Sequence, residues 1–390
     1  MNGVGEREKI TQNRVINLFE NKLGYKYLGN WKDRKNNSNI EEELLRDYLR
    51  RKGYREELIT RAIEELIKAS SNQVDKLYYV NKDVYSLLRY GAKVKENVGD
   101  NKETVTFIDW NKPYENDFYI AEEVSVKGEN TKRPDIVLYV NGIAIGVLEL
   151  KRSTVSVSEG IRQNLDNQSS NFIKPFFHTM QLVMAGNDTE GLRYGTIETS
   201  EKYYLTWKED NKATDLLSKE VEQICSELEY SIDKELVGLC HKERLFELLH
   251  DFVVFDRGIK KLCRPNQYFG IKAAQKRVKA REGGIIWHTQ GSGKSLTMVW
   301  LTKWIRENIP DSRILIITDR DELDKQIEKV YKGVEEDIYR TKSGKDLIEK
   351  LNNTTPLLLC SLIHKFGGKN EDESYEEYIK ELTQNYTLYL

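Results

Sequence analysis

Hydrophobic residues recur in two distinct patterns along this chain, and together these patterns predict a mixed α/β protein. Apolar residues spaced three and four apart predict a pair of amphipathic helices over residues 39–69, interrupted at Gly53. Short apolar runs predict buried strands in both halves of the chain. The expected strands are 105–108, 118–121, 136–140, 143–150, 284–287, 313–319, 356–361 and 386–390.

The order of these elements predicts two domains. Asn141-Gly142 separates two of the strands and is a strong signal for a tight hairpin. After Trp207 the chain becomes polar with helical spacing, and beyond it strands alternate with helices, which predicts a parallel sheet. A chain of 390 residues exceeds what one core usually serves. We therefore expect a boundary near residue 240, with domains over 1–240 and 241–390.

A phosphate-binding loop is the most specific chemical signal in the chain. Residues 288–295 read His-Thr-Gln-Gly-Ser-Gly-Lys-Ser and lie between the expected strand 284–287 and an expected helix that includes 296–304. In such a unit the backbone N–H groups at the helix N-terminus face a phosphate, and the glycines allow its close approach. The segment therefore predicts binding of ATP with Mg²⁺.

Each polar residue of this loop has an expected role. Lys294 would reach the terminal phosphates, and the Ser295 hydroxyl would ligate the Mg²⁺ ion carried by ATP. The expected strand 386–390 ends without the acidic residue that helps hold Mg²⁺ in P-loop ATPases, so we expect this chain to bind ATP far better than it hydrolyses it. The expected loop residues in contact with nucleotide are Thr289, Gly291, Ser292, Gly293, Lys294 and Ser295.

A second group of charged residues lies at the open end of the expected hairpin. Asp135 precedes its first strand, and its second strand ends in Glu149-Leu150-Lys151. Strand alternation places Glu149 and Lys151 on one face, and the hairpin brings Asp135 beside them. The two carboxylates can bind Mg²⁺, and the lysine can position the attacking water and offset phosphate charge, as phosphodiester hydrolysis requires. The alternative is structural, with Asp135 capping a turn and the other two solvated.

Composition narrows the class of protein without changing this picture. Hydrophobic residues make up 39% of the chain, charged residues 32%, and the formal net charge is −2. No apolar run reaches the roughly 18 residues of a membrane span, so we expect a cytoplasmic protein. Four widely spaced cysteines indicate neither a disulfide framework nor a zinc site. Nine basic residues and no acidic one lie between Arg257 and Arg281, which indicates a solvated helix face or a phosphate-binding surface.

Together these motifs resemble the restriction (R, motor and nuclease) subunit of type I restriction-modification enzymes. Residues 133–142 and 149–152 resemble the nuclease motif of that family, and 287–297 resemble its first motor motif, His288 included. The resemblance implies a PD-(D/E)xK nuclease-like domain with a helical N-terminal region over 1–240. It also implies that residues 241–390 form the first part of a RecA-like P-loop domain of superfamily 2 helicases, truncated before the Walker B motif.

The resemblance adds expected roles for three further residues. Gln267 lies in a segment similar to the element that reads the adenine edge of ATP, and Arg320 lies in one similar to a motif that contacts the DNA backbone. Gln163 corresponds to the first residue of a Gln-x-x-x-Tyr element, although Asn167 stands where the tyrosine is expected, which weakens a DNA-contact role. Residues 182–188 are also similar to a segment of the family's nuclease domain.

One acidic residue of the family pattern has no clear counterpart. The family often adds an N-terminal carboxylate to the metal site, and this chain has Gln12 at the expected place. Glu8, Glu20 and the pair Glu41 and Glu43 stay open as alternatives.

The function implied is that of an ATP-dependent type I site-specific deoxyribonuclease. Such an enzyme couples ATP-driven DNA translocation to Mg²⁺-dependent cleavage of double-stranded DNA, in a complex with modification (methyltransferase) and specificity subunits. We expect this chain alone to be inactive as an ATPase. Two alternatives remain: another helicase–nuclease fusion, such as a type III or stand-alone phage-defence enzyme, and a P-loop DNA-binding protein without nuclease activity.

Overall fold

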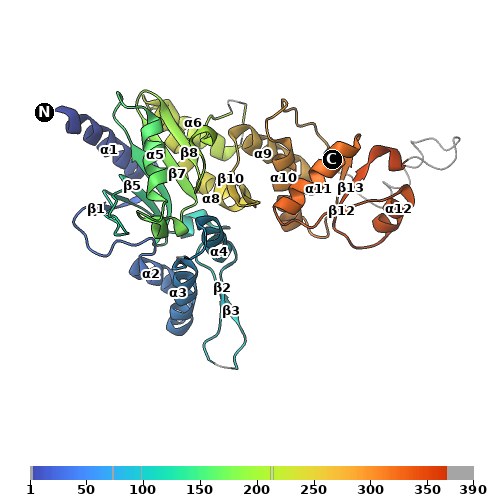
Figure 1. Ribbon diagram of the computed structural model, residues 1–390, viewed down its shortest axis with the longest axis horizontal. Helices are drawn as coiled ribbons and strands as arrows, with labels where there is room; N and C mark the ends of the chain where they lie inside the picture. The colour runs from blue at the N-terminus through green and yellow to red at the C-terminus, as the bar shows by residue number, and fades with distance from the viewer. Residues whose placement is uncertain (1–2, 73, 98, 211, 214, 367–390) are drawn as a thin grey trace. The chain divides into compact units, whose positions relative to one another are not determined.

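The chain divides into two compact units (Figure 1). The computed structural model describes residues 3–366 except 73, 98, 211 and 214. The first unit contains Met1–Val253 and Gly258–Arg264, and the second contains Val254–Arg257 and the chain from Pro265 onward. Two short strands lie where the chain passes between the units, β9 (Val253–Asp256) and β10 (Ile259–Leu262). The boundary expected near residue 240 falls inside the first unit.

A six-stranded mixed sheet forms the centre of the first unit, in the order β1-β4-β5-β6-β7-β8. The pairs β1–β4 and β6–β7 are parallel, and the other neighbours are antiparallel. Strands β5 and β6 occupy the middle of the sheet, and every residue in them is buried. The strands are β1 (Lys26–Asn30), β4 (Phe118–Glu122), β5 (Ile136–Val140), β6 (Ile143–Leu150), β7 (Leu182–Asn187) and β8 (Gly191–Gly195).

The hairpin predicted from Asn141-Gly142 is confirmed. Asn141 has a φ of 52° and Gly142 a φ of 86°, and Val140 pairs with Ile143 across the turn. Positive φ at both central residues is the geometry that Asn-Gly favours, because it matches the twist of the strands. The Asn141 side chain, fully buried, also donates to the Phe107 carbonyl and accepts from the backbone N–H of Asp117.

Helices cover both faces of this sheet (Figure 1). Helix α5 packs on β6 and β7, α7 on β8, and α1 on β1 and β6. The predicted helical pair is confirmed as α2 and α3, whereas the expected strand 105–108 is largely absent because β3 ends at Val105. No described helix has the length and apolar character needed to span a membrane. The helices are α1 (Gly3–Asn21), α2 (Glu42–Arg51), α3 (Glu56–Ser70), α4 (Leu77–Tyr90), α5 (Val157–Asn167), α6 (Leu216–Ser226), α7 (Ser231–Cys240) and α8 (Lys242–Asp251), with 3-10 turns η1 (Pro113–Glu115), η2 (Lys174–His178) and η3 (Glu201–Tyr203) and the small hairpin β2 (Ala92–Val94) and β3 (Glu103–Val105).

The second unit contains the parallel sheet predicted from alternating strands and helices. Its three described strands follow the order β11-β13-β12, and both pairs are parallel. Helix α11 packs against all three strands, and α9 packs against α10. The elements are α9 (Pro265–Lys279), α10 (Lys294–Asn308), β11 (Ile314–Thr318), α11 (Asp321–Gly333), β12 (Tyr339–Arg340), α12 (Gly344–Asn352), β13 (Leu358–Leu362) and η4 (Ile363–Phe366).

The buried strand expected over residues 284–287 does not form. The segment has no regular secondary structure, and Ile285 and Trp287 are 89% and 90% exposed. A strand needs a hydrogen-bonded neighbour, and no described strand pairs with this segment. The other strand expected near the phosphate loop, 386–390, lies outside the described residues.

We predict that Gly142→Ala destabilises the first unit more than Gly53→Ala does. Both glycines have positive φ, 86° and 84°, so alanine is strained at either position. Only at position 142 would the added Cβ meet other atoms, lying 2.7 Å from the Glu41 carbonyl oxygen and 2.9 Å from the Leu45 nitrogen. We expect Gly53→Ala to cost about 1 kcal/mol and Gly142→Ala at least ~1 kcal/mol more.

Urea unfolding of the two variants, followed by circular dichroism, measures this difference. Equal midpoints would mean that the hairpin turn relaxes away from α2 without cost.

Candidate functional site

The open end of the β5–β6 hairpin brings Asp135, Glu149 and Lys151 together. Ile136 pairs with Leu148, so Asp135 lies beside the end of β6. The Asp135 Oδ2 atom accepts a hydrogen bond of 2.7 Å from the Leu150 backbone N–H. Glu149 and Lys151 are two residues apart and lie on the same face, and Lys151 Nζ lies 3.8 Å from Glu149 Oε2. The hairpin thus creates the cluster that strand alternation predicted.

Glu149 is the most constrained member of this cluster. Its side chain is 0% exposed, and its Oε1 atom receives no hydrogen bond from any described donor. Burial raises the pKa of the Glu149 carboxyl well above its usual range, and the negative charge of Asp135 raises it further. Burial also raises the pKa of Asp135 to about 6, against the opposing effect of the Leu150 N–H group. The two side chains lie within reach of each other, so one shared proton relieves their repulsion when no cation is present.

Gln163 joins Glu149 to Lys151. From α5 its Nε2 group donates to Glu149 Oε2 at 2.8 Å, and its Oε1 atom accepts from Lys151 Nζ at 2.7 Å. Helix α5 comes close enough because Gly160 faces the same strand: a Cβ there would lie 3.5 Å from the Glu149 Cβ and 3.4 Å from the Lys151 Cγ. The sequence suggested a DNA contact for Gln163, whereas both ends of its amide are engaged by these two side chains. Gln163 lies on α5, the first helix after β6, and this position in the chain is the sequence signal that could have indicated its contact with Glu149 and Lys151.

The chemistry of this cluster fits a divalent cation. Hard cations such as Mg²⁺ prefer carboxylate oxygens, and here two carboxylates converge, one of them with a buried oxygen that has no hydrogen-bond donor in the described part of the chain. Two buried carboxylates side by side are costly to leave charged, and either a shared proton or a bound cation lowers that cost. Asp135 and Glu149 are therefore the residues able to hold the ion.

The structure separates the candidates for an additional N-terminal acid. Gln12 on α1 does reach the cluster, because its Nε2 group lies 3.2 Å from Glu122 Oε2 and 3.4 Å from the Asp135 carbonyl. Glu41 instead donates its backbone N–H to the Gly142 carbonyl, at the turn end of the hairpin and away from the cluster. Glu43 follows Glu41 at the start of α2, Glu20 lies near the end of α1, and the side chain of Glu8 lies outside the described residues.

In the second unit, the phosphate loop leads into α10 as predicted. Helix α10 begins at Lys294, and Gly293 before it has a left-handed φ of 90°. The Lys294 ammonium donates to the carbonyls of His288 and Thr289, each at 3.2 Å, and the Ser292 hydroxyl donates to the Thr289 carbonyl at 2.7 Å. Phosphate oxygens are stronger partners for an ammonium than neutral carbonyls. Ser295 lies one residue into the helix, half-buried.

Gln267 and Arg320 occupy different surroundings in this unit. Gln267 on α9 is buried, and its Nε2 group donates to the Gly293 carbonyl at 2.9 Å, so it supports the phosphate loop directly. Arg320 precedes α11, its side chain is 73% exposed, and its Nε atom lies 3.5 Å from Asp319. An exposed guanidinium is accessible to a nucleic-acid backbone.

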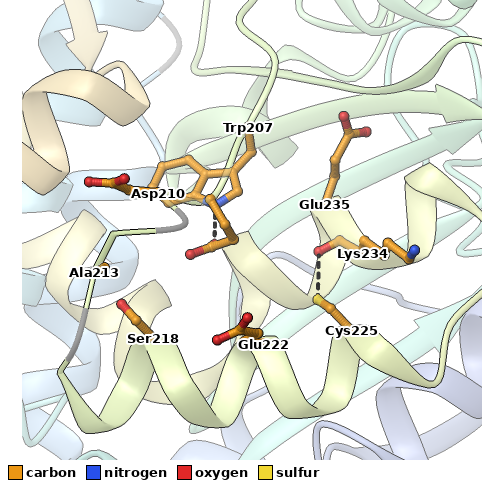
Figure 2. Close-up of a pocket in the computed structure, with 9 residues that line it drawn as sticks. Trp207, Asp210, Ala213, Ser218, Glu222, Cys225, Lys234 and Glu235 are labelled. Carbon is orange, nitrogen blue, oxygen red and sulfur yellow. Dashed lines mark hydrogen bonds between the residues drawn. The ribbon is translucent and has the colours of Figure 1, made fainter.

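The first unit also contains a cavity that lies apart from the Asp135, Glu149 and Lys151 cluster. A cavity of about 220 Å³ borders α6 and α7, and Figure 2 shows Trp207, Glu222 and Lys234 among its lining residues. Cys225 also lines it, but burial raises the pKa of this thiol to about 11, so it is protonated at neutral pH and is no nucleophile.

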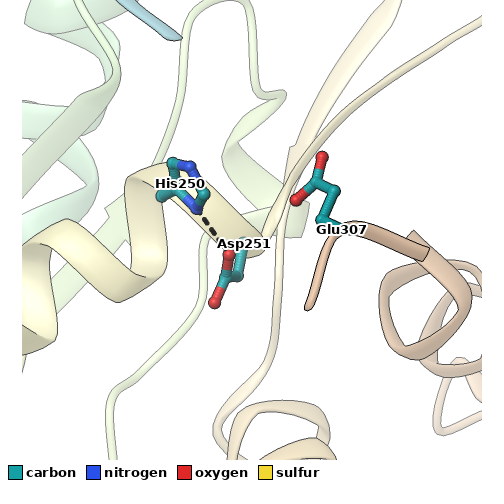
Figure 3. Close-up of side chains that lie close together, drawn as sticks. All are labelled: His250, Asp251 and Glu307. Atoms are coloured by element: carbon teal, nitrogen blue, oxygen red, sulfur yellow. Dashed lines mark hydrogen bonds and ion pairs between the residues drawn. The ribbon is translucent and has the colours of Figure 1, made fainter. Parts of the chain in front are cut away.

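His250 and Asp251 end α8, and His250 Nδ1 lies 2.6 Å from Asp251 Oδ1 (Figure 3). Glu307 in the same view belongs to α10 of the second unit. Because the positions of the two units relative to each other are not determined, we assign no common site to these three residues.

Two family models match the chain: the first covers the Asp135, Glu149 and Lys151 cluster, and the second covers the phosphate loop. Residues 5–202, just over half of the chain, match the N terminus of the type I restriction enzyme R protein, and this range includes Asp135, Glu149 and Lys151. Residues 266–389 match the SWI2/SNF2 ATPase family, and this range includes Lys294. An ATPase-like region therefore follows a restriction-enzyme region.

Curated proteins with similar sequences carry names of the same kind. The chain is 26% identical over 408 residues to a Methanocaldococcus jannaschii protein named as the endonuclease subunit of type I restriction enzyme MjaIXP, a match that covers 94% of this chain and 38% of that protein. It is 27% identical to the type I restriction enzyme HindI endonuclease subunit of Haemophilus influenzae, over 74% of this chain and 28% of that protein. The chain thus spans well under half the length of these relatives. With its mixed α/β first unit and the match over residues 5–202, the chain belongs to the family of type I restriction enzyme R proteins.

Proposed function

We propose that the whole protein cleaves double-stranded DNA with Mg²⁺ and translocates DNA with ATP, as the restriction subunit of a type I restriction-modification complex. The first unit would be the endonuclease domain, with a PD-(D/E)xK fold, and the second the beginning of a RecA-like motor domain. The observation that carries the proposal is the convergence of Asp135, Glu149 and Lys151, with a buried Glu149 oxygen to which none of the described residues donates.

The geometry supports a division of labour among the site residues. Asp135 is oriented by the Leu150 N–H, and Glu149 by Gln163, so both carboxylates keep fixed positions. Lys151 Nζ is held by Gln163 Oε1, at a place where its charge can offset that of a scissile phosphate or orient an attacking water. When bound, Mg²⁺ would polarise the phosphate and promote formation of the hydroxide nucleophile.

The second unit supports the motor part of the proposal. Lys294 is held by two neutral carbonyls, which it can exchange for the terminal phosphates of ATP, and Ser295 would ligate the accompanying Mg²⁺. Thr289, Gly291, Ser292 and Gly293 would supply backbone and hydroxyl contacts. Arg320 would contact the DNA backbone, and we keep the reading of the adenine edge by Gln267 as a prediction.

The partner subunits are inferred from the family and are therefore part of the proposal. The relatives described above are named as endonuclease subunits of type I restriction enzymes. We infer that modification and specificity subunits supply sequence recognition, since neither cluster described above reads bases.

We predict that Glu149→Gln abolishes DNA cleavage but keeps ATP hydrolysis. The amide retains the side-chain volume and removes the charge that holds the cation, so cleavage should fall at least about 100-fold. The measurement is cleavage of a circular plasmid with a recognition site, by the full-length protein assembled with its partner subunits, ATP and Mg²⁺. ATP hydrolysis is recorded in the same reactions.

Glu159→Gln is the matched control, because this exposed glutamate lies on α5 near the cluster. It should cut like the wild type. Undiminished cutting by Glu149→Gln would remove the nuclease assignment and favour a P-loop DNA-binding protein. Cutting by the purified wild-type subunit without partners would favour the stand-alone or type III alternative.

We predict that Lys294→Ala abolishes ATP hydrolysis in the assembled enzyme. Charge-assisted hydrogen bonds contribute about 1.5–3 kcal/mol, so ATP binding should weaken roughly 10- to 100-fold. Binding of a fluorescent ATP analogue to the 390-residue chain measures this loss directly. Lys345→Ala, at an exposed lysine of the same unit, should bind like the wild type, and equal binding by Lys294→Ala would refute the role.

We predict a pH-dependent difference in stability between the wild type and Asp135→Asn. Both site carboxyls have pKa values raised by burial, so between about pH 4 and the folded pKa the folded state holds more protons than the unfolded state. The contribution of Asp135 to stability is complete below about pH 4 and is lost as the pH rises through about 6. Asparagine does not ionise, so the variant should gain melting temperature relative to the wild type over this range.

Differential scanning calorimetry without divalent cations measures this difference. Added Mg²⁺ should raise the wild-type melting temperature more at pH 7 than at pH 5, because the ion and the proton compete for the same oxygens. A difference between the two proteins that stays constant with pH would argue against the buried pair.

A further inference from the structure

Helix α9 carries basic residues along one face of its C-terminal half. Lys272, Lys276 and Lys279 are spaced four and three residues apart, so they lie side by side on the helix. Lys276 and Lys279 are exposed, and so is Arg281, two residues beyond the helix. Lys276, Lys279 and Arg281 form a basic row, which contains the end of the basic run seen in the sequence.

The basic row lies apart from the phosphate loop. Gln267, which contacts the loop at Gly293, lies near the start of α9. Lys276 and Lys279 follow nine and twelve residues later, which places them roughly 14 to 18 Å farther along the helix at about 1.5 Å per residue. A phosphate bound by the row is therefore a different one from those expected at Lys294.

The charges of the basic row are not neutralised within the described part of the chain. No described carboxylate forms an ion pair with these three residues, and the Lys279 ammonium lies 5.3 Å from the centre of the Trp304 ring. Other cations of the same unit do have acidic partners. The pairs are Lys303 and Arg306 with Glu336, Lys325 with Asp321, Lys332 with Glu328, and Lys350 with Glu349. The row is thus a local excess of positive charge, which attracts a polyanion.

Arg281 has a backbone conformation that usually belongs to glycine at the end of a helix. Its φ is 57°, in the left-handed region, and its backbone N–H donates to the Val278 carbonyl at 3.0 Å. Glycine adopts this conformation without a steric penalty, whereas a residue with a Cβ does not. Backbone stability does not explain an arginine here, but a contact between its side chain and an external anion does.

Basic residues near the end of a helix also have a structural explanation. Their charges interact favourably with the unpaired carbonyl groups of the last turn. The same effect favours acidic residues in the first turn of a helix, yet α9 has none there and none in its 15 residues. Stabilisation of the helix therefore accounts for its basic end, but it does not account for the lack of acidic residues.

We propose that the basic row binds the phosphate backbone of double-stranded DNA, in addition to the contact proposed for Arg320. The inference rests on the proposed function, because DNA is the polyanion on which a restriction subunit acts. It deepens that function by naming a surface of the second unit that holds the duplex. Contacts with phosphates carry no sequence information, which suits an enzyme that moves along DNA of any sequence.

Fluorescence anisotropy with a labelled duplex of about 30 base pairs, without nucleotide, tests this inference over about 50 to 200 mM salt. For the 390-residue chain with Lys276→Gln and Lys279→Gln together, the plot of log affinity against log salt should be shallower by about 2. This is the change expected for two lost phosphate contacts, and affinity at the lowest salt should fall about tenfold or more.

The variant with Lys332→Gln and Lys350→Gln is the matched control. It loses the same net charge from the same unit, but each of its lysines is paired with a glutamate. It should bind the duplex with the slope and affinity of the wild type. An equal loss in both double variants would mean that net charge rather than α9 determines binding, and the inference would fail.

Two further outcomes would overturn the inference. One is a wild-type slope in the Lys276 and Lys279 variant, or no duplex binding by the wild type. Plasmid cleavage by the assembled enzyme then decides separately on the proposed function. The other is displacement of the duplex by polyglutamate as readily as by unlabelled duplex at equal charge concentration, which would indicate an acidic protein as the partner.

Arg281→Gly adds a readout that a structural role would move in the opposite direction. Glycine relieves the left-handed conformation, so this variant should melt at a higher temperature than the wild type. It should also bind the duplex about threefold more weakly or worse, because one phosphate contact is lost. A lower melting temperature with unchanged duplex affinity would mean that Arg281 serves the helix alone and would contradict the proposed contact.

Discussion

The first unit is organised around a fully buried carboxylate, Glu149, placed beside Asp135. Burying two like charges side by side costs several kcal/mol unless each is paired or protonated. The structure offsets part of this cost with a backbone N–H to Asp135, the Gln163 amide to Glu149, and Lys151 nearby. Among the residues that the structure describes, none donates a hydrogen bond to the Oε1 atom of Glu149. A fold selected for stability alone would place an apolar residue at this position in the middle of the sheet, so the arrangement favours a charged ligand.

Most of this site could be predicted from sequence because it is local. Asp135, Glu149 and Lys151 belong to one hairpin, whose turn is specified by Asn141-Gly142 and whose strands are specified by their apolar runs. Gln163 was found by resemblance, but its contacts depend on α5 crossing β6 and β7. The sequence did not predict that the Glu123 backbone N–H contacts the Asp135 carbonyl. This contact depends on the pairing of β4 with β5, and the order of strands in a sheet is not contained in the pattern of any single strand.

The phosphate loop illustrates the opposite case, in which a local pattern predicts an element that needs non-local partners. The apolar run 284–287 predicts a strand, but its backbone groups can be satisfied only by a neighbouring strand, and none of those described lies beside it. Helix α10 forms regardless, because its hydrogen bonds are internal. The conformation of the loop therefore follows from the helix and from the Gln267 contact to Gly293, rather than from a strand before it.

The two candidate sites share one physical arrangement, although their chemistry differs. In each, a lysine is held by oxygen acceptors that a phosphate can replace or join: Gln163 for Lys151, and two backbone carbonyls for Lys294. A lysine locked into a strong ion pair would have to break that pair before meeting its substrate. Neutral acceptors orient the ammonium at lower cost and leave its charge uncompensated. Lys151 does have a carboxylate near it, at 3.8 Å, but the shorter contact is to the amide of Gln163, which also holds that carboxylate. Gln163 thereby keeps the lysine and the glutamate apart, so that one can face an anion and the other a cation.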